Sequence, residues 1–364
     1  MAMAEEISKI ILLSKKERSS NLELYRILVM LSIVAHHYVV NSGVLEIAKD
    51  NPTSFNSIYY YLFGAWGKTG INCFVLITGY FMCKSQVTLQ KFLKLFFEVL
   101  FYTIIVNSIL IIAGKEKVTI MELWNNMQVM TDVSSCFTSC FIMFYLFIPF
   151  LNILIHNMSQ RQHLSLIMLC LAIYTGISTL LLGKVEMNYV VWFCVLYFIS
   201  SYIRLYKPMQ NVQWGYVLGG VFSLSVLSII MMLILFDMTG KNLPPYYFIS
   251  DSNKVLALFL SVSLFMWFKD VKIPQSKIIN RIAQSCFGVL LIHANSNAMR
   301  QWLWKDTLDV AGQYYTDTFI LHSIISVIGV YIVCTFIDQT RIEWLEKPLF
   351  RWLEGKKCKW QSRI

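Results

Sequence analysis

The chain has 364 residues, of which 57% are hydrophobic and only 14% are charged, and its formal net charge is +10. Soluble domains carry about a quarter charged residues, so this composition excludes an ordinary soluble protein. The net charge alone would fit a nucleic-acid partner, but the basic residues lie mostly between long apolar runs, which is typical of membrane proteins.

Ten apolar runs follow one another along the chain, and each is about long enough to cross a bilayer as a helix. We therefore predict an all-α polytopic membrane protein with about ten transmembrane helices. The predicted organisation is a cytoplasmic segment (1–21) before a retained first helix, a membrane domain (22–337) and a cytoplasmic amphipathic tail (338–364). The runs cover residues 22–41, 66–82, 92–113, 135–155, 164–182, 188–205, 214–236, 253–268, 278–297 and 319–337.

Basic residues are unevenly distributed between the connections. When successive connections are assigned to alternate sides, the side that holds both termini carries 21 of the 31 Lys and Arg residues and the other side carries 9. Cytoplasmic loops are enriched in Lys and Arg, so we predict that both termini are cytoplasmic. The positive charge then faces anionic lipid, and no nucleic-acid partner is expected.

The first run, "NLELYRILVMLSIVAHHYVV", carries Glu23, Arg26, His36 and His37. Ionisable residues inside a membrane need a partner, a cavity or a function. On a helix Glu23, Arg26 and His37 fall within about 60° of one another, whereas His36 points about 80° away from Arg26. Two simpler interpretations stay open: a Glu23–Arg26 ion pair at the membrane interface, and a hydrogen bond from His37 to a neighbouring helix.

Arg26 and His37 lie about 16 Å apart along the helix axis, which is too far for both to act on one atom. We expect them to serve different depths of one tunnel. Arg26 lies near the cytoplasmic end, where a guanidinium suits a phosphate group. His37 lies toward the outer side, where an imidazole can accept a proton from a hydroxyl.

Residues 67–85, "GKTGINCFVLITGYFMCKS", place Lys68 on the same side as the two histidines. Thr78 and the following glycine belong to a small, polar surface suited to close helix packing. The next run begins with Lys91 and Lys94. Lys94 and Glu98 have i,i+4 spacing, so we expect them to pair, with a cytoplasmic anion site formed by the two lysines as the alternative.

Three further histidines are informative. His293 ends the segment "SCFGVLLIH" near the outer end of its run. His156 and His163 fall in a polar connection on the basic side, where we expect them to be solvated.

Several common catalytic and metal-binding patterns are missing from the sequence. The nine cysteines form no CxxC pair and no Cys/His ligand spacing, so no metal site is expected. HExxH, GxSxG, the phosphate-binding Walker loop and GxGxxG after a strand are also absent. The chemistry is therefore of another kind.

Together these segments resemble the acyltransferase 3 family, the integral membrane O-acyltransferases of bacterial envelope glycans. The family signature is an Arg in the first span followed, after ten residues, by a His, and Arg26 and His37 fit it. Glu23 matches the acidic position before the Arg, and "VLITGYFM" matches the second-span motif with Thr78 where Ser is usual. "YLFIPFLN" and the segment ending in His293 match later motifs, but the Trp common before the Tyr…Pro segment is replaced by "SSCFTSCF".

The resemblance implies a fold with ten spans, in the bacterial cytoplasmic membrane. It implies acyl-CoA, most often acetyl-CoA, as a cytoplasmic donor substrate rather than a bound cofactor. The acceptor is then a hydroxyl of a lipid-linked or exported glycan at the outer face. Membrane lipids and polysaccharide-assembly proteins are the other partners it implies.

On this hypothesis His37 is the general base for the acceptor hydroxyl or a relay to it. Arg26 positions the phosphates of the donor or polarises its thioester carbonyl, and Glu23 orients Arg26 or His37. The remaining candidates are substrate-binding residues: His36, Lys68, Thr78, Lys91, Lys94 and His293.

Two other classes of protein fit the same residues. A transporter or flippase of polysaccharide assembly would also use polar stripes and intramembrane histidines. A membrane sensor could bind a ligand on the same scaffold without turnover, because a fold does not establish an activity.

Overall fold

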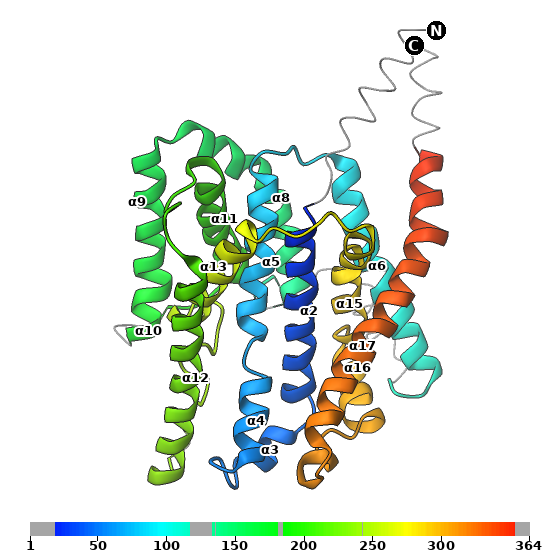
Figure 1. The fold of residues 1–364 in the computed structure, drawn as a ribbon. Coiled ribbons are helices and arrows are strands. Elements are labelled where there is room, and N and C mark those ends of the chain that lie inside the picture. Colours follow the sequence, from blue (N-terminus) through cyan, green and yellow to red (C-terminus); the bar gives the residue numbers. More distant parts are fainter. Residues whose placement is uncertain (1–18, 117–132, 135, 181–184, 242, 354–364) are drawn as a thin grey trace.

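The computed structural model describes residues 19–116, 133–134, 136–180, 185–241 and 243–353, and within these residues every regular element is a helix (Figure 1). The predicted all-α membrane class therefore fits. Most of the predicted N-terminal segment and the end of the predicted tail (354–364) lie outside the described residues.

A helix lies within each of the ten predicted runs. The long ones are α2 (Ser20–Val40), α5 (Gly67–Met82), α6 (Leu89–Ile112), α8 (Phe137–Asn157), α9 (Gln160–Leu171), α11 (Tyr189–Tyr206), α12 (Trp214–Thr239), α13 (Val255–Asp270) and α17 (Phe319–Arg341). The shorter ones are α3 (Val44–Ala48), α4 (Phe55–Phe63), α10 (Ser178–Leu180), α14 (Lys277–Ile282), α15 (Cys286–His293) and α16 (Asn297–Gln301). Single turns of tighter or wider helix extend several of these: Ala172–Ile177, Ala283–Ser285, Trp302–Thr307, Gly312–Tyr315 and Ile342–Glu346.

Seven of the described helices are long and apolar enough to cross a membrane: 20–40, 89–112, 137–157, 160–180, 189–206, 214–239 and 319–353. The other three predicted runs hold shorter helices. Helices α5 and α13 have 16 residues each, and the run 278–297 is divided between α14 and α15. Ten spans and the cytoplasmic position of the termini therefore stay predictions.

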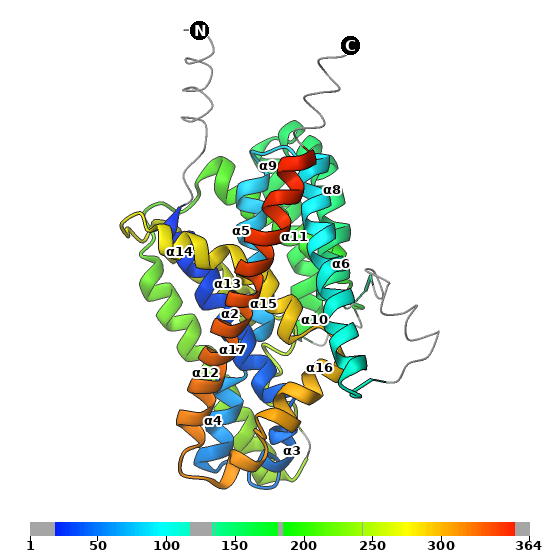
Figure 2. The same cartoon turned by 90° about the vertical axis from the view of Figure 1, so that its right-hand side faces the viewer.

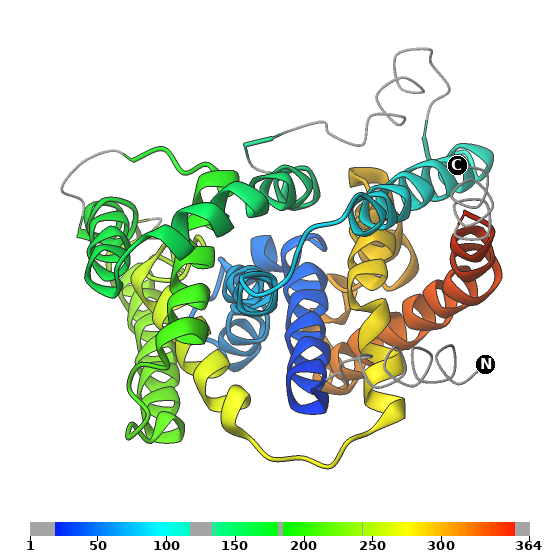
Figure 3. The ribbon, with the colours of Figure 1, turned by 90° about the horizontal axis from the view of Figure 1, so that it is seen from above.

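Helix α2 lies at the centre of the bundle and packs against α5, α13, α15 and α17. Viewed from above, α2 and α5 are surrounded, with α9, α11 and α12 on one side and α6, α15 and α17 on the other (Figure 3). This position explains why α2 tolerates polar residues. The face that carries Glu23, Arg26 and His37 contacts other helices rather than lipid.

The packing of α5 against α11 depends on a small residue. A Cβ atom added at Gly79 would overlap the hydroxyl of Ser200 on α11. Such small residues let membrane helices approach closely, as the sequence pattern predicted.

The first and last described helices reach the same end of the molecule. Helix α2 begins there, and the helix that contains α17 continues to Leu353 and ends there (Figures 1 and 2). This end also carries Arg26, so we call it the Arg26 end of α2 and call the opposite end the His37 end.

Candidate active site

A short non-helical connection joins α4 to α5 next to the His37 end of α2. Helix α4 stops at Phe63 and α5 starts at Gly67. Nδ1 of His36 lies 2.5 Å from the carbonyl oxygen of Gly64 in this break and donates a hydrogen bond to it. A side chain at Gly67 would overlap the imidazole of His36. The structure therefore places His36 in a packing position at the helix break.

His37 and His293 form a hydrogen-bonded pair of imidazoles. Nδ1 of His37 lies 2.9 Å from Nε2 of His293, and Nδ1 of His293 lies 2.6 Å from the carbonyl oxygen of Val289. The carbonyl can only accept, so Nδ1 of His293 carries the hydrogen and Nε2 of a neutral His293 is an acceptor. Nδ1 of His37 must then donate, which leaves Nε2 of a neutral His37 with a free lone pair. This tautomer, assigned from the bonding pattern, is the one a general base requires.

Helix α15 brings His293 to this position by running beside α2 in the same direction. Cys286, at the start of α15, lines the same cavity as Arg26, and His293, at its end, bonds to His37. The two helices therefore connect the two ends of the polar stripe.

Arg26 lies beside Glu23 at the other end of the stripe. Their closest charged atoms are 3.4 Å apart, and the carboxylate is buried while the guanidinium is about a quarter exposed. Glu23 therefore orients the guanidinium, and some of the guanidinium surface is left open to a cavity.

This cavity has a volume of about 330 Å³ and brings together four of the residues singled out from the sequence: Arg26, Thr78, Lys91 and Lys94. Its walls come from α2, α5, α6, α8, α15 and α17, so it lies between the central helices and the side formed by α6, α15 and α17. Nζ of Lys91 donates to the hydroxyl of Ser85 and the carbonyl of Gln86, each at 2.8 Å. Those acceptors are neutral, so Lys91 adds net positive charge to the cavity.

The predicted Lys94–Glu98 pair is wrong. Lys94 pairs with Glu346 at 2.5 Å, and Glu98 accepts from Arg341 at 3.0 Å. Arg341, at the end of α17, also bonds Asp338 at 2.9 Å and Glu346 at 2.8 Å. A guanidinium has five N–H donors arranged in a fork, so the buried Arg341 can bind three carboxylates at once. Glu98 is neutralised by Arg341 and does not require Lys94 as a partner.

A second polar network surrounds Lys68 and includes residues that sequence reasoning missed. Nζ of Lys68 donates to the Tyr189 hydroxyl at 2.6 Å and lies 3.6 Å from the Asp251 carboxylate. The Tyr189 hydroxyl in turn donates to Asp251 at 3.1 Å. Tyr189 and Asp251 are polar residues at the ends of apolar runs. That position was the one feature of the sequence by which they could have been found.

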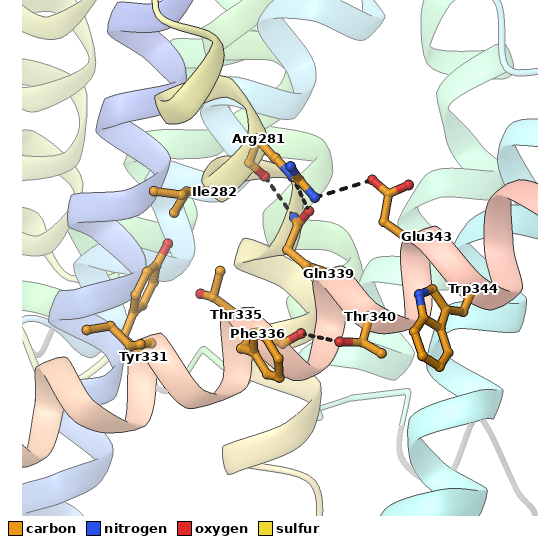
Figure 4. Close-up of a pocket in the computed structure, with 10 residues that line it drawn as sticks. Arg281, Ile282, Tyr331, Thr335, Phe336, Gln339, Thr340, Glu343 and Trp344 are labelled. Atoms are coloured by element: carbon orange, nitrogen blue, oxygen red, sulfur yellow. Dashed lines mark hydrogen bonds and ion pairs between the residues drawn. The ribbon is translucent and has the colours of Figure 1, made fainter.

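The larger cavities contain none of the residues predicted for the site. One of about 660 Å³ is lined almost entirely by apolar side chains of α6, α16 and α17. Another, of about 580 Å³, runs along α17 (Figure 4). There Arg281 bonds Gln339 and pairs with Glu343, so the charged groups of this cavity neutralise each other.

The described residues contain no group of three or more His, Cys, Asp or Glu side chains placed to hold a metal ion. The charged cavity at Arg26 and the imidazole pair are the two ends of the candidate site. An unbroken α2 joins them over about 16 Å, as predicted.

Comparison with known proteins gives one match. A family model described as an acyltransferase domain matches residues 19–338. No curated protein and no solved structure matches the chain. The match includes both α2 and His293, and thus both ends of the candidate site.

Proposed function

The chain belongs to the acyltransferase 3 family and is a membrane acyltransferase, and we propose that it transfers an acetyl group from cytoplasmic acetyl-CoA to a hydroxyl of a bacterial surface or exported glycan. The observation that carries this proposal is the His37–His293 pair, which leaves Nε2 of His37 free to accept a proton. The proposed location is the bacterial cytoplasmic membrane.

The donor binds at the Arg26 end. Coenzyme A is strongly anionic through its phosphates, and guanidinium and ammonium groups bind phosphate well. Arg26, Lys91 and Lys94 line one cavity there, which supports this assignment. The long arm of coenzyme A separates its phosphates from its thioester, so a donor held at Arg26 extends along α2 toward His37.

The acceptor hydroxyl reacts at the His37 end. His37 takes the hydroxyl proton on Nε2 as the oxygen attacks the thioester carbonyl. The resulting imidazolium is stabilised by its hydrogen bond to His293. When the tetrahedral intermediate collapses, the thiolate of coenzyme A leaves and receives the proton from His37. Lys68, with Tyr189 and Asp251, contributes polar groups for the acceptor.

A deletion strain complemented with variant genes tests the proposal. Wild-type protein should restore acetyl signals in the NMR spectrum of the surface glycan, and His37→Ala should not, although it accumulates in the membrane at the wild-type level. His156→Ala is the matched control, because His156 is exposed and, among the described residues, bonds only the carbonyl of Asn152 on its own helix. Retained acetylation in His37→Ala would contradict the assignment of the base.

The same strains distinguish the alternatives predicted from the sequence. A flippase or transporter would change how much glycan reaches the surface and leave its acetyl content unchanged. A sensor would bind acetyl-CoA without turnover in purified form. Either result would contradict the acyltransferase assignment for this chain.

A further inference from the structure

Arg300 lies on the segment that packs against the imidazole pair, and its side chain has no partner among the described residues. Arg300 belongs to α16, which follows α15 and His293 closely in sequence. Its Nε atom is buried and has no hydrogen-bond partner. Among the described residues its guanidinium forms no ion pair, and the segment that carries it contacts His293 through Trp304.

Lys68, the cation predicted on the same side as the histidines, is satisfied differently. Lys68 has a hydroxyl and a carboxylate as partners, Tyr189 and Asp251. Arg300 therefore supplies the positive charge whose donors are still available. A partly buried cation without a counterion is costly, and an oxygen anion is the group that would satisfy it.

The segment that carries Arg300 is fixed against the imidazole pair by Trp304. The Trp304 ring is fully buried and meets His293 edge-on at 6.3 Å between centroids and Tyr38 of α2 at 5.8 Å. Trp304 follows Arg300 by about one helical turn, so both side chains leave the same side of this segment. The contact with both α15 and α2 holds the backbone of Arg300 at a set distance from His37.

We propose that Arg300 stabilises the oxyanion formed in the acyl transfer, an inference that rests on the proposed function. In this step the acceptor oxygen forms a bond to the thioester carbon and its proton moves to Nε2 of His37. The carbonyl π electrons move to the carbonyl oxygen, which becomes the anion that Arg300 binds. When the electrons return, the carbon–sulfur bond breaks and the coenzyme A thiolate takes the proton from His37.

This role explains why the cation lies beside groups that start neutral. The step creates an imidazolium and an oxyanion together. The fixed positive charge of Arg300 destabilises the imidazolium and stabilises the oxyanion. A guanidinium that donates directly to the oxyanion gives a net gain, because preorganised donors stabilise charge where it develops.

Steady-state kinetics of the purified protein in detergent or nanodiscs tests the role, with acetyl-CoA and a soluble glycan acceptor. Arg300→Gln should lower kcat by about 10²- to 10³-fold, the usual loss of one oxyanion donor, while KM for acetyl-CoA changes by less than about threefold. Arg300→Lys should retain part of the rate. Added guanidinium should restore part of the activity of Arg300→Ala, an effect that a merely structural residue would not show.

Arg281→Gln is the matched control, because Arg281 is largely exposed and its side-chain partners among the described residues are Gln339 and Glu343. It should retain wild-type kcat. A wild-type kcat for Arg300→Gln would overturn the role, as would a rise in acceptor KM with kcat unchanged, which would show that the anion belongs to the acceptor instead. A wild-type protein that transfers no acetyl group would overturn the proposed function, and this role with it.

Discussion

The two ends of α2 satisfy their charges in opposite ways. At the Arg26 end most charged groups are paired: Arg26 with Glu23, Lys94 with Glu346, and Arg341 with three carboxylates. At the His37 end Lys68 is paired with Asp251, but the imidazoles bond one another and a backbone carbonyl, and Arg300 has no counterion among the described residues.

This difference separates binding from chemistry. A network of ion pairs can exchange one of its carboxylates for the phosphates of a donor, which makes the Arg26 end a site for recognition. The His37 end has free capacity for a proton and for a negative charge, and both develop only during reaction. Arg341, His293, Arg26 and Glu346 each contribute one element of this contrast, and substituting each one tests it.

The largest effect is expected from Arg341→Met. It leaves Glu98, Asp338 and Glu346 near one another without their shared cation, and losing one partner of a buried ion pair typically costs about 3–5 kcal/mol. Thermal unfolding in detergent should show a clear decrease in Tm, whereas Arg351→Met, at an exposed position, should not. An unchanged Tm for Arg341→Met would show that the network contributes little to stability.

His293→Ala should affect the chemical step with little effect on donor binding. Without its acceptor, Nδ1–H of His37 is left unsatisfied and the reactive tautomer is no longer fixed, so kcat should fall by about 10- to 100-fold. His293→Gln can supply an oxygen acceptor and should lose less. Equal losses in the two variants would indicate that the role of His293 is packing alone.

Arg26→Gln should act on binding. Removing one charge-assisted hydrogen bond should raise KM for acetyl-CoA by about tenfold or somewhat more, with a smaller change in kcat. The dependence of KM on ionic strength should also weaken, since fewer charges attract the donor. An unchanged KM would remove Arg26 from the donor site.

The smallest effect is expected from Glu346→Gln. Glu346 engages Lys94, so it competes with donor phosphates for this ammonium. Lys94 is about half exposed, and such pairs contribute at most about 1 kcal/mol, so KM for acetyl-CoA should decrease by no more than about fivefold. Glu343→Gln, which alters a neighbouring exposed carboxylate, is the control. A higher KM for Glu346→Gln would contradict the competition.

Much of the fold could be predicted from the sequence. Apolar runs located the helices, and the spacing of Glu23, Arg26 and His37 placed them on one stripe of α2, because a helix obeys a fixed period. The family match confirms the resemblance. The breaks beside α5 and α15 were not predicted, since hydropathy measures apolar length and not where a buried helix begins.

The errors in the site come from residues far apart in the chain. The i,i+4 rule paired Lys94 with Glu98 because it considers one helix, whereas the partner of Glu98 lies 243 residues later. His163, expected to be solvated, is buried, because α9 begins at Gln160 and turns this imidazole toward α11, where it bonds the carbonyl of Phe198. Arg300 had no signal in the sequence, because only the fold brings the segment of Arg300 and Trp304 into contact with α2.

The most direct test of the separation between binding and chemistry compares His37→Ala and Arg26→Gln in two assays. Binding of a non-transferable acetyl-CoA analogue is measured by calorimetry, and acetyl transfer is measured on the same samples. We predict that His37→Ala binds the analogue with wild-type affinity and transfers no acetyl group, while Arg26→Gln binds it at least several-fold more weakly. Loss of binding in His37→Ala equal to that in Arg26→Gln would contradict the account.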